Sequence, residues 1–135
     1  MSIQLAVSTR NARLDAIETD IGTSAVMKIR SGAPPASCAA ADSGTVLAQL
    51  DLPSDWMAAA SGGSKAKAGT WQEPSADAAG TAAHFRVYQS DGTTCKLQGT
   101  VTATGGGGDL TVDNTNIAIG QVVTVTGFTL TDGNP

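Results

Sequence analysis

The pattern of hydrophobic and polar positions changes near residue 23. Before that point, apolar residues recur at spacings of three and four, which predicts an amphipathic helix over residues 8–21. These apolar residues are Leu14, Ile17 and Ile21. Ser8 can cap the start of this helix, and Gly22 suits the left-handed conformation that often follows a helix end. A helix this short is marginally stable alone, so it must pack on a sheet or on a partner.

After residue 23 the chain is rich in Thr, Ala and Gly and favours short β-strands. Strand-like segments lie at residues 25–29, 45–52, 67–72, 82–89, 94–102, 110–113 and 121–130. Asp91-Gly92 predicts a hairpin turn, and the glycine run at 105–108 predicts a flexible connection. Because no helical segments separate the strands, an alternating βαβ fold is excluded.

These elements predict a mainly β protein. We expect a β-sandwich or jelly-roll-like domain of about seven to eight short strands, with one short N-terminal α-helix. The predicted organisation is an N-terminal helical arm, residues 1–22, followed by a β-sandwich domain, residues 23–135.

Composition points to a thin core and to contacts with other subunits. The hydrophobic fraction is 41%, but much of it is Ala, and only 15% of residues are charged, with a net charge of −4. Small side chains bury little area, but they allow close packing against a neighbour. The basic residues are scattered, which argues against nucleic-acid binding. No apolar run is long enough to span a bilayer, and the N-terminus lacks a secretory signal, so we expect synthesis in the cytoplasm and no membrane association.

Reactive side chains are few. The single histidine, His84, alternates with Phe85 and Val87 and shares a predicted strand face with Arg86 and Tyr88, as on a solvated or subunit-facing strand. Loose pairs of carboxylates fit ordinary turn chemistry better than calcium ligation or acid–base catalysis. The glycine-rich segments lack the spacing of phosphate-binding loops. We therefore expect no catalytic residue, no cofactor and no metal.

Two residue pairs leave alternatives open. Cys38 and Cys95 form a disulfide only if the fold brings them together in an oxidising compartment, and the cytoplasmic interpretation favours free thiols. Cys95, with Leu97 on its strand, is expected to face the core. Of the two tryptophans, Trp71 is expected in the core, whereas Trp56 is left open between the core and a binding surface.

Several segments resemble a family of small tailed-bacteriophage and prophage proteins. The matching segments are VSTRNARLDAIE at 7–18, IGTSA at 21–25, LPSDWMAAA at 52–60, GTWQ at 69–72, HFRVY at 84–88 and GFTL at 127–130. Members of this family are mostly virion structural proteins of unassigned function. The resemblance therefore implies a particle component, located in the virion after synthesis in the bacterial cytoplasm. It supplies no functional residues to transfer.

The expected function is a non-enzymatic structural component of a tailed phage particle, as a capsid decoration or cement protein that stabilises the head. It would bind the major capsid protein or another virion protein as a small homo-oligomer. The expected partner-binding residues are Arg10, Arg13, Leu14, Ile17 and Trp56. The alternatives are a tail or head–tail accessory protein, a carbohydrate-binding module that uses Trp56 or Tyr88, and, least favoured, a thiol hydrolase that uses Cys95 and His84.

Overall fold

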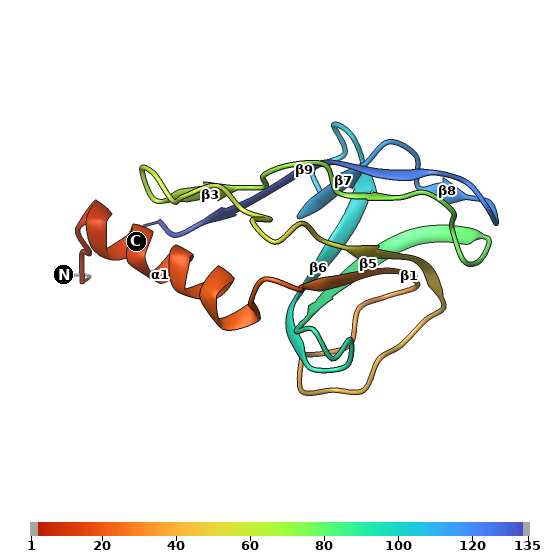
Figure 1. Cartoon of the computed structure of the whole chain (residues 1–135), viewed down its shortest axis with the longest axis horizontal. Helices are drawn as coiled ribbons and strands as arrows, with labels where there is room; N and C mark the ends of the chain where they lie inside the picture. The colour runs from red at the N-terminus through yellow and green to blue at the C-terminus, as the bar shows by residue number, and fades with distance from the viewer. Residues whose placement is uncertain (1–2, 134–135) are drawn as a thin grey trace.

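A computed structural model describes residues 3–133 and shows one helix followed by nine strands in that range (Figure 1). The elements are α1 (Val7–Ile21), β1 (Val26–Ser31), β2 (Val46–Asp51), β3 (Ser64–Ala66), β4 (Gln72–Glu73), β5 (Gly80–Tyr88), β6 (Cys95–Ala103), β7 (Leu110–Val112), β8 (Asn116–Ile117) and β9 (Val123–Thr131). The prediction of a mainly β fold with a single short N-terminal helix is confirmed.

The strands belong to one curled mixed sheet. Its order is β2-β1-β5-β6-β7-β9-β3, with β4 paired to β9 and β8 paired to β5. All pairs are antiparallel except β6 with β7. Since β4 also contacts β2, the curl brings the first strand of the sheet close to the strand attached to β9. Curling lets one sheet enclose its own core.

Aromatic rings form the centre of that core. Trp56 and Trp71 have ring centroids 5.9 Å apart, Trp71 lies 5.5 Å from Phe128, and Phe128 packs edge-on against Phe85 at 5.6 Å. All four side chains are buried. The expectation that Trp71 lies in the core is confirmed, and Trp56 lies beside it.

Local sequence predicted the end of α1 but not its start. The helix begins at Val7 with Ala6 as its N-cap residue and without a side-chain cap, so the expected capping role of Ser8, which lies inside the helix, is wrong. At the other end, Gly22 has φ 97° and its N–H bonds the Glu18 carbonyl at 2.9 Å, as expected. Ile21 enters the main core, so the chain is already anchored when the helix stops.

The expected strand at 67–72 is wrong in its bounds. The structure instead has β3 and β4, which pair with opposite ends of β9. Between them, the Lys67 N–H bonds the Phe128 carbonyl and the Trp71 carbonyl accepts from Val125, so the segment still follows β9. A turn at Gly69, with φ 71°, interrupts the ladder. The interruption allows the large Trp71 ring to enter the core.

The glycine run forms a packed return between β6 and β7. These two strands are parallel, yet only residues 104–109 join them, so the chain must turn back sharply. The Gly108 N–H bonds the Thr102 hydroxyl at 3.0 Å, and a Cβ on Gly108 would lie 2.9 Å from the Thr102 backbone nitrogen. A side chain at position 108 has no space, because the backbone there lies close to Thr102, and this explains the glycine.

Candidate functional site

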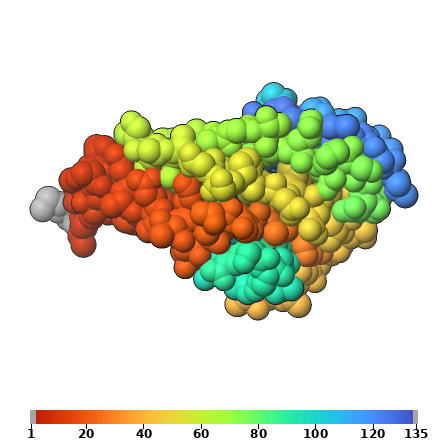
Figure 2. All heavy atoms as spheres, in the orientation of Figure 1, coloured from red at the N-terminus to blue at the C-terminus, as the bar shows by residue number. Residues whose placement is uncertain are grey.

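The helix α1 projects from one end of the molecule (Figures 1 and 2), and β3 and the end of β9 lie along it (Figure 1). Lys65 on β3 attaches it. The Lys65 side chain is only 2% exposed, and its ammonium lies 2.6 Å from an Asp15 carboxylate oxygen and 3.7 Å from Glu18. It also donates to the Ala58 carbonyl at 2.9 Å. A buried ammonium needs such partners, so the helix is fixed to the sheet by charge as well as by apolar packing.

Asp15 is the helix residue that forms the shorter ion pair with Lys65. The hydrogen bond from Lys65, followed by one from the Ala60 backbone N–H at 3.0 Å, holds the pKa of the Asp15 carboxyl below its usual value. One turn earlier, the Asn11 side-chain oxygen accepts from the Gly63 N–H at 2.9 Å. The segment before β3, residues 60–63, is therefore hydrogen-bonded to two successive turns of the helix.

The expected contact residues of the helix divide between attachment and surface. Arg10 donates to the Asp132 carbonyl at 2.9 Å, and Leu14 is buried. Ile17 is half-buried against the core. Arg13 pairs with the Asp132 carboxylate at 3.1 Å but keeps 61% of its side chain exposed. Of these four residues, Arg13 is therefore the most available to a partner.

A groove runs between α1 and the end of β9. It has a volume of about 470 Å³ and is lined by Arg13, Leu14, Ala16, Ile17, Thr131 and Asp132. Three of the expected residues, Arg13, Leu14 and Ile17, thus line one open groove, together with the exposed Ala16. The lining is mixed, with apolar side chains on the helix and a charged pair at one edge.

Trp56 lies away from this surface. Its ring is completely buried, and its indole N–H donates to the Gly22 carbonyl at 3.0 Å, which ties the helix end to the core. It therefore offers no face to a partner in this structure. Tyr88 is equally buried, so neither aromatic residue can stack on a sugar, and the carbohydrate-binding interpretation loses its residues.

The polar face of β5 is covered, contrary to the expectation of a solvated or subunit-facing strand. The connection between β1 and β2, which we call the covering loop (residues 32–45), lies over it. Arg86 is 1% exposed and donates to the Ser37 and Ala40 carbonyls at 2.9 and 3.1 Å. The physical reason is that the loop supplies acceptors for side chains that sequence alone would place in water.

Asp42 of the covering loop is the centre of this polar cluster. Its carboxylate pairs with Arg86, accepts from Arg30 at 3.0 Å and accepts from the Tyr88 hydroxyl at 2.8 Å. Burial alone would raise the pKa of Asp42, but the hydrogen bonds from Tyr88 and Arg86 outweigh it and hold the pKa below its usual value. Burial, with the bond to Asp42, raises the pKa of Tyr88.

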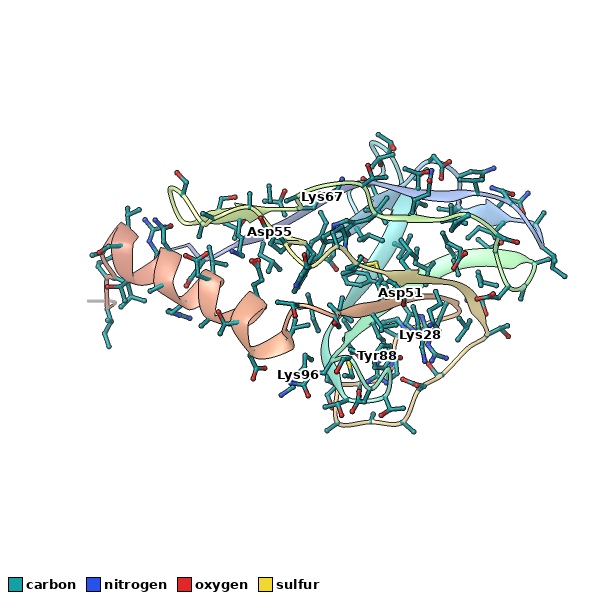
Figure 3. The ribbon with its side chains drawn as sticks, in the orientation of Figure 1. Lys28, Asp51, Asp55, Lys67, Tyr88 and Lys96 are labelled. Carbon is teal, nitrogen blue, oxygen red and sulfur yellow. The ribbon has the colours of Figure 1, made fainter. Side chains whose placement is uncertain are left out.

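Lys28 completes the cluster at the hairpin end. Its ammonium lies 4.9 Å from the centre of the Tyr88 ring and donates to the Gly92 carbonyl at 2.9 Å. Figure 3 shows Lys28 and Tyr88 beside each other under the sheet. These contacts are structural: they tie the hairpin and β1 together.

The histidine and the cysteine of the thiol-hydrolase alternative do not meet. His84 is buried, its Nδ1 lies 2.7 Å from the Gly32 carbonyl oxygen, and its Nε2 has no hydrogen-bond partner. His84 on β5 is opposite Thr100 on β6, whereas Cys95 on β6 is opposite Tyr88, four residues further along β5. A thiol–imidazole pair needs direct hydrogen-bond contact, so the geometry does not support this mechanism.

Cys95 also points away from the core, contrary to expectation. Val87 pairs with Leu97 but Tyr88 pairs with Cys95, so one extra residue of β6 bulges between them. Directly opposed residues share a face of the sheet. Leu97 therefore packs against the core with Val87, while Cys95 lies on the Tyr88 face, under the covering loop.

All eight basic side chains make contacts within the chain, through ion pairs, carbonyl oxygens or aromatic rings. Several carboxylates, in contrast, are exposed, among them Asp51, Asp55 and Asp77. With a net charge of −4, the accessible surface is therefore acidic. Such a surface favours a basic or neutral partner.

Residues 3–133 are the described part of the chain. No helix there has the length and apolarity to cross a membrane, and no group of three metal-ligating side chains gathers there. Comparisons of the chain with protein-family models, with curated proteins and with solved structures find no match.

Proposed function

We propose that this chain is a non-enzymatic structural component of a tailed phage particle, and specifically a decoration protein that binds the capsid as a small oligomer. The resemblance noted in the sequence indicates a particle component. The observation that carries the proposal further is the helix end, where a firmly attached α1 presents Arg13 beside an open groove. Lys65 and Asp132 already fix the helix, so binding costs little conformational entropy.

In this proposal the partner is a capsid subunit that inserts an apolar side chain into the groove, beside the ion pair of Arg13 and Asp132. The fold supplies a curled sheet that adds mass over the joints between subunits. Covered polar groups and a buried apolar core suit a protein that must stay folded on an assembled shell.

The test uses particles produced from the genome that encodes this chain. We expect the chain in purified particles, counted by quantitative mass spectrometry. Hundreds of copies would indicate the head, whereas about three to a dozen would indicate a ring in the tail, which is the alternative in the same class. If purified particles lack the chain, the proposal is wrong.

The groove is tested with a matched pair of variants added to particles that lack the chain. Ala16 and Ala12 are both exposed on α1, but only Ala16 lines the groove. Ala16→Glu adds bulk and charge to the groove and should lower binding at least tenfold, while Ala12→Glu should bind like the original chain. Equal binding by both variants would remove the groove from the proposal.

A further inference from the structure

The two cysteines lie far apart in the sequence but meet in the fold. Cys38 belongs to the covering loop and Cys95 opens β6. The Cys38 thiol acts on the Cys95 thiol from the facing loop, so the two side chains are neighbours. Both side chains are partly buried, and both are reduced in this structure.

Backbone contacts on both sides hold the thiols at this place. Arg86 binds the carbonyls of Ser37 and Ala40, which flank Cys38. The bulge in β6 turns Cys95 to the same face as Tyr88, whose hydroxyl binds Asp42 of the covering loop. Loop and strand are therefore positioned by groups other than the sulfur atoms, and the meeting of the thiols follows from that framework.

We propose that Cys38 and Cys95 are a disulfide site, which locks the covering loop onto the sheet once the chain leaves a reducing compartment. The proposal does not depend on the phage function. It concerns a covalent modification that a released particle or a secreted protein would experience equally.

The reaction needs an oxidant, which we take to be a small disulfide such as glutathione disulfide. One protein thiolate attacks a sulfur of that disulfide and releases one glutathione, which takes up the proton lost by the attacking thiol. The second protein thiol, also losing its proton, then attacks the protein sulfur of the mixed disulfide and releases a second glutathione. Two protein thiols are thereby oxidised, and one glutathione disulfide is reduced to two glutathione molecules.

The surroundings of Cys95 indicate a structural bond rather than a reactive thiol. Burial, followed by the hydrogen bond with Cys38, raises the pKa of Cys95 to about 11. At neutral pH Cys95 therefore stays protonated and is a slow nucleophile. We expect the exchange to be slow at pH 7 and to accelerate as the pH rises.

The experiment incubates the folded chain with glutathione disulfide at pH 8.5 and follows intact mass and a non-reducing peptide map. We expect loss of two hydrogen atoms, a linked peptide pair containing Cys38 and Cys95, and no free thiol for alkylation. The cross-link closes a loop of roughly 57 residues, so the Tm of the oxidised chain should exceed that of the reduced chain by about 10 °C.

The variants Cys38→Ser and Cys95→Ser are the matched controls, and the Tm of each should be independent of the redox state. The urea-unfolded chain is a second control, in which a smaller fraction of the chain should be cross-linked at the same ratio of glutathione disulfide to glutathione. The proposal is overturned if the folded chain keeps two alkylatable thiols, if it cross-links only between chains, or if oxidation lowers the Tm. The first outcome can be read even when a serine variant fails to fold.

Discussion

Asp42 gives the sharpest test of how the covering loop is held. Asp42→Asn keeps the shape of the side chain but removes its charge. It leaves Arg86 and Arg30, whose side chains are 2% and 7% exposed, without an anionic partner. Breaking a fully buried ion pair costs roughly 3–5 kcal/mol. The Asp42 side chain is 37% exposed and Arg86 keeps carbonyl acceptors, so we expect a smaller loss of about 2–3 kcal/mol.

Urea unfolding measures this loss as a change in the free energy of unfolding. A matched control is Asp55→Asn, an exposed carboxylate outside the covering loop, which should change stability by less than about 0.5 kcal/mol. In an Arg86→Met background, Asp42→Asn should cost clearly less, because one of the buried charges is gone. If Asp42→Asn proves as neutral as Asp55→Asn, the covering loop is not held by this cluster.

The same cluster predicts a pH dependence with a definite sign. The folded-state pKa of Asp42 lies below the ordinary value of 3.8. Its stabilising contribution is therefore complete above about pH 4 and is lost as the pH falls through the folded-state pKa. The stability difference between the original chain and Asp42→Asn should shrink below pH 4. A difference that stays constant down to pH 2 would contradict the assignment.

Two further predictions concern other parts of the fold. Asp15→Asn removes the nearest anion from buried Lys65, so we expect lower stability and faster hydrogen exchange in α1 than in the sheet; uniform exchange in both would contradict the attachment. Gly108→Ala places a methyl group against the Thr102 backbone and should cost about 1–3 kcal/mol in urea unfolding, whereas Gly133→Ala, with open space around it, should be neutral. Equal stability of the two alanine variants would show that the return loop adjusts freely.

The sequence predicted features that depend on neighbouring residues. The helix and its end at Gly22 follow from periodicity and from one glycine with positive φ. The hairpin at Asp91 follows from turn chemistry, and its carboxylate, bonded by the Thr94 hydroxyl and backbone N–H groups, has a pKa lowered to about 2. The β-rich character follows from composition and alternation. In each case the residues that determine the feature lie within one turn of it.

The expected contact residues were predictable only in part. Apolar periodicity placed Leu14 and Ile17 on one helix face, expected to pack on a sheet or on a partner, and in the structure Leu14 is buried and Ile17 packs against the core of the chain itself. Their partners on β3 and β9 could not be found, because Lys65 and Asp132 are ordinary charged residues until the fold buries one and positions the other. No local signal distinguishes a lysine that will be buried.

Sequence by itself determined most of the helix and strand segments, because those preferences arise from local sterics and spacing, but not the split of residues 64–73 into β3 and β4. Tertiary structure alone decided which face of each strand is covered. One bulged residue in β6 moves Cys95 from the side of Leu97 to the side of Tyr88, and a loop of polar and small residues becomes the partner of two buried arginines. The physical reason is that a side chain's environment depends on register and on distant chain segments, and both are fixed only when the sheet closes.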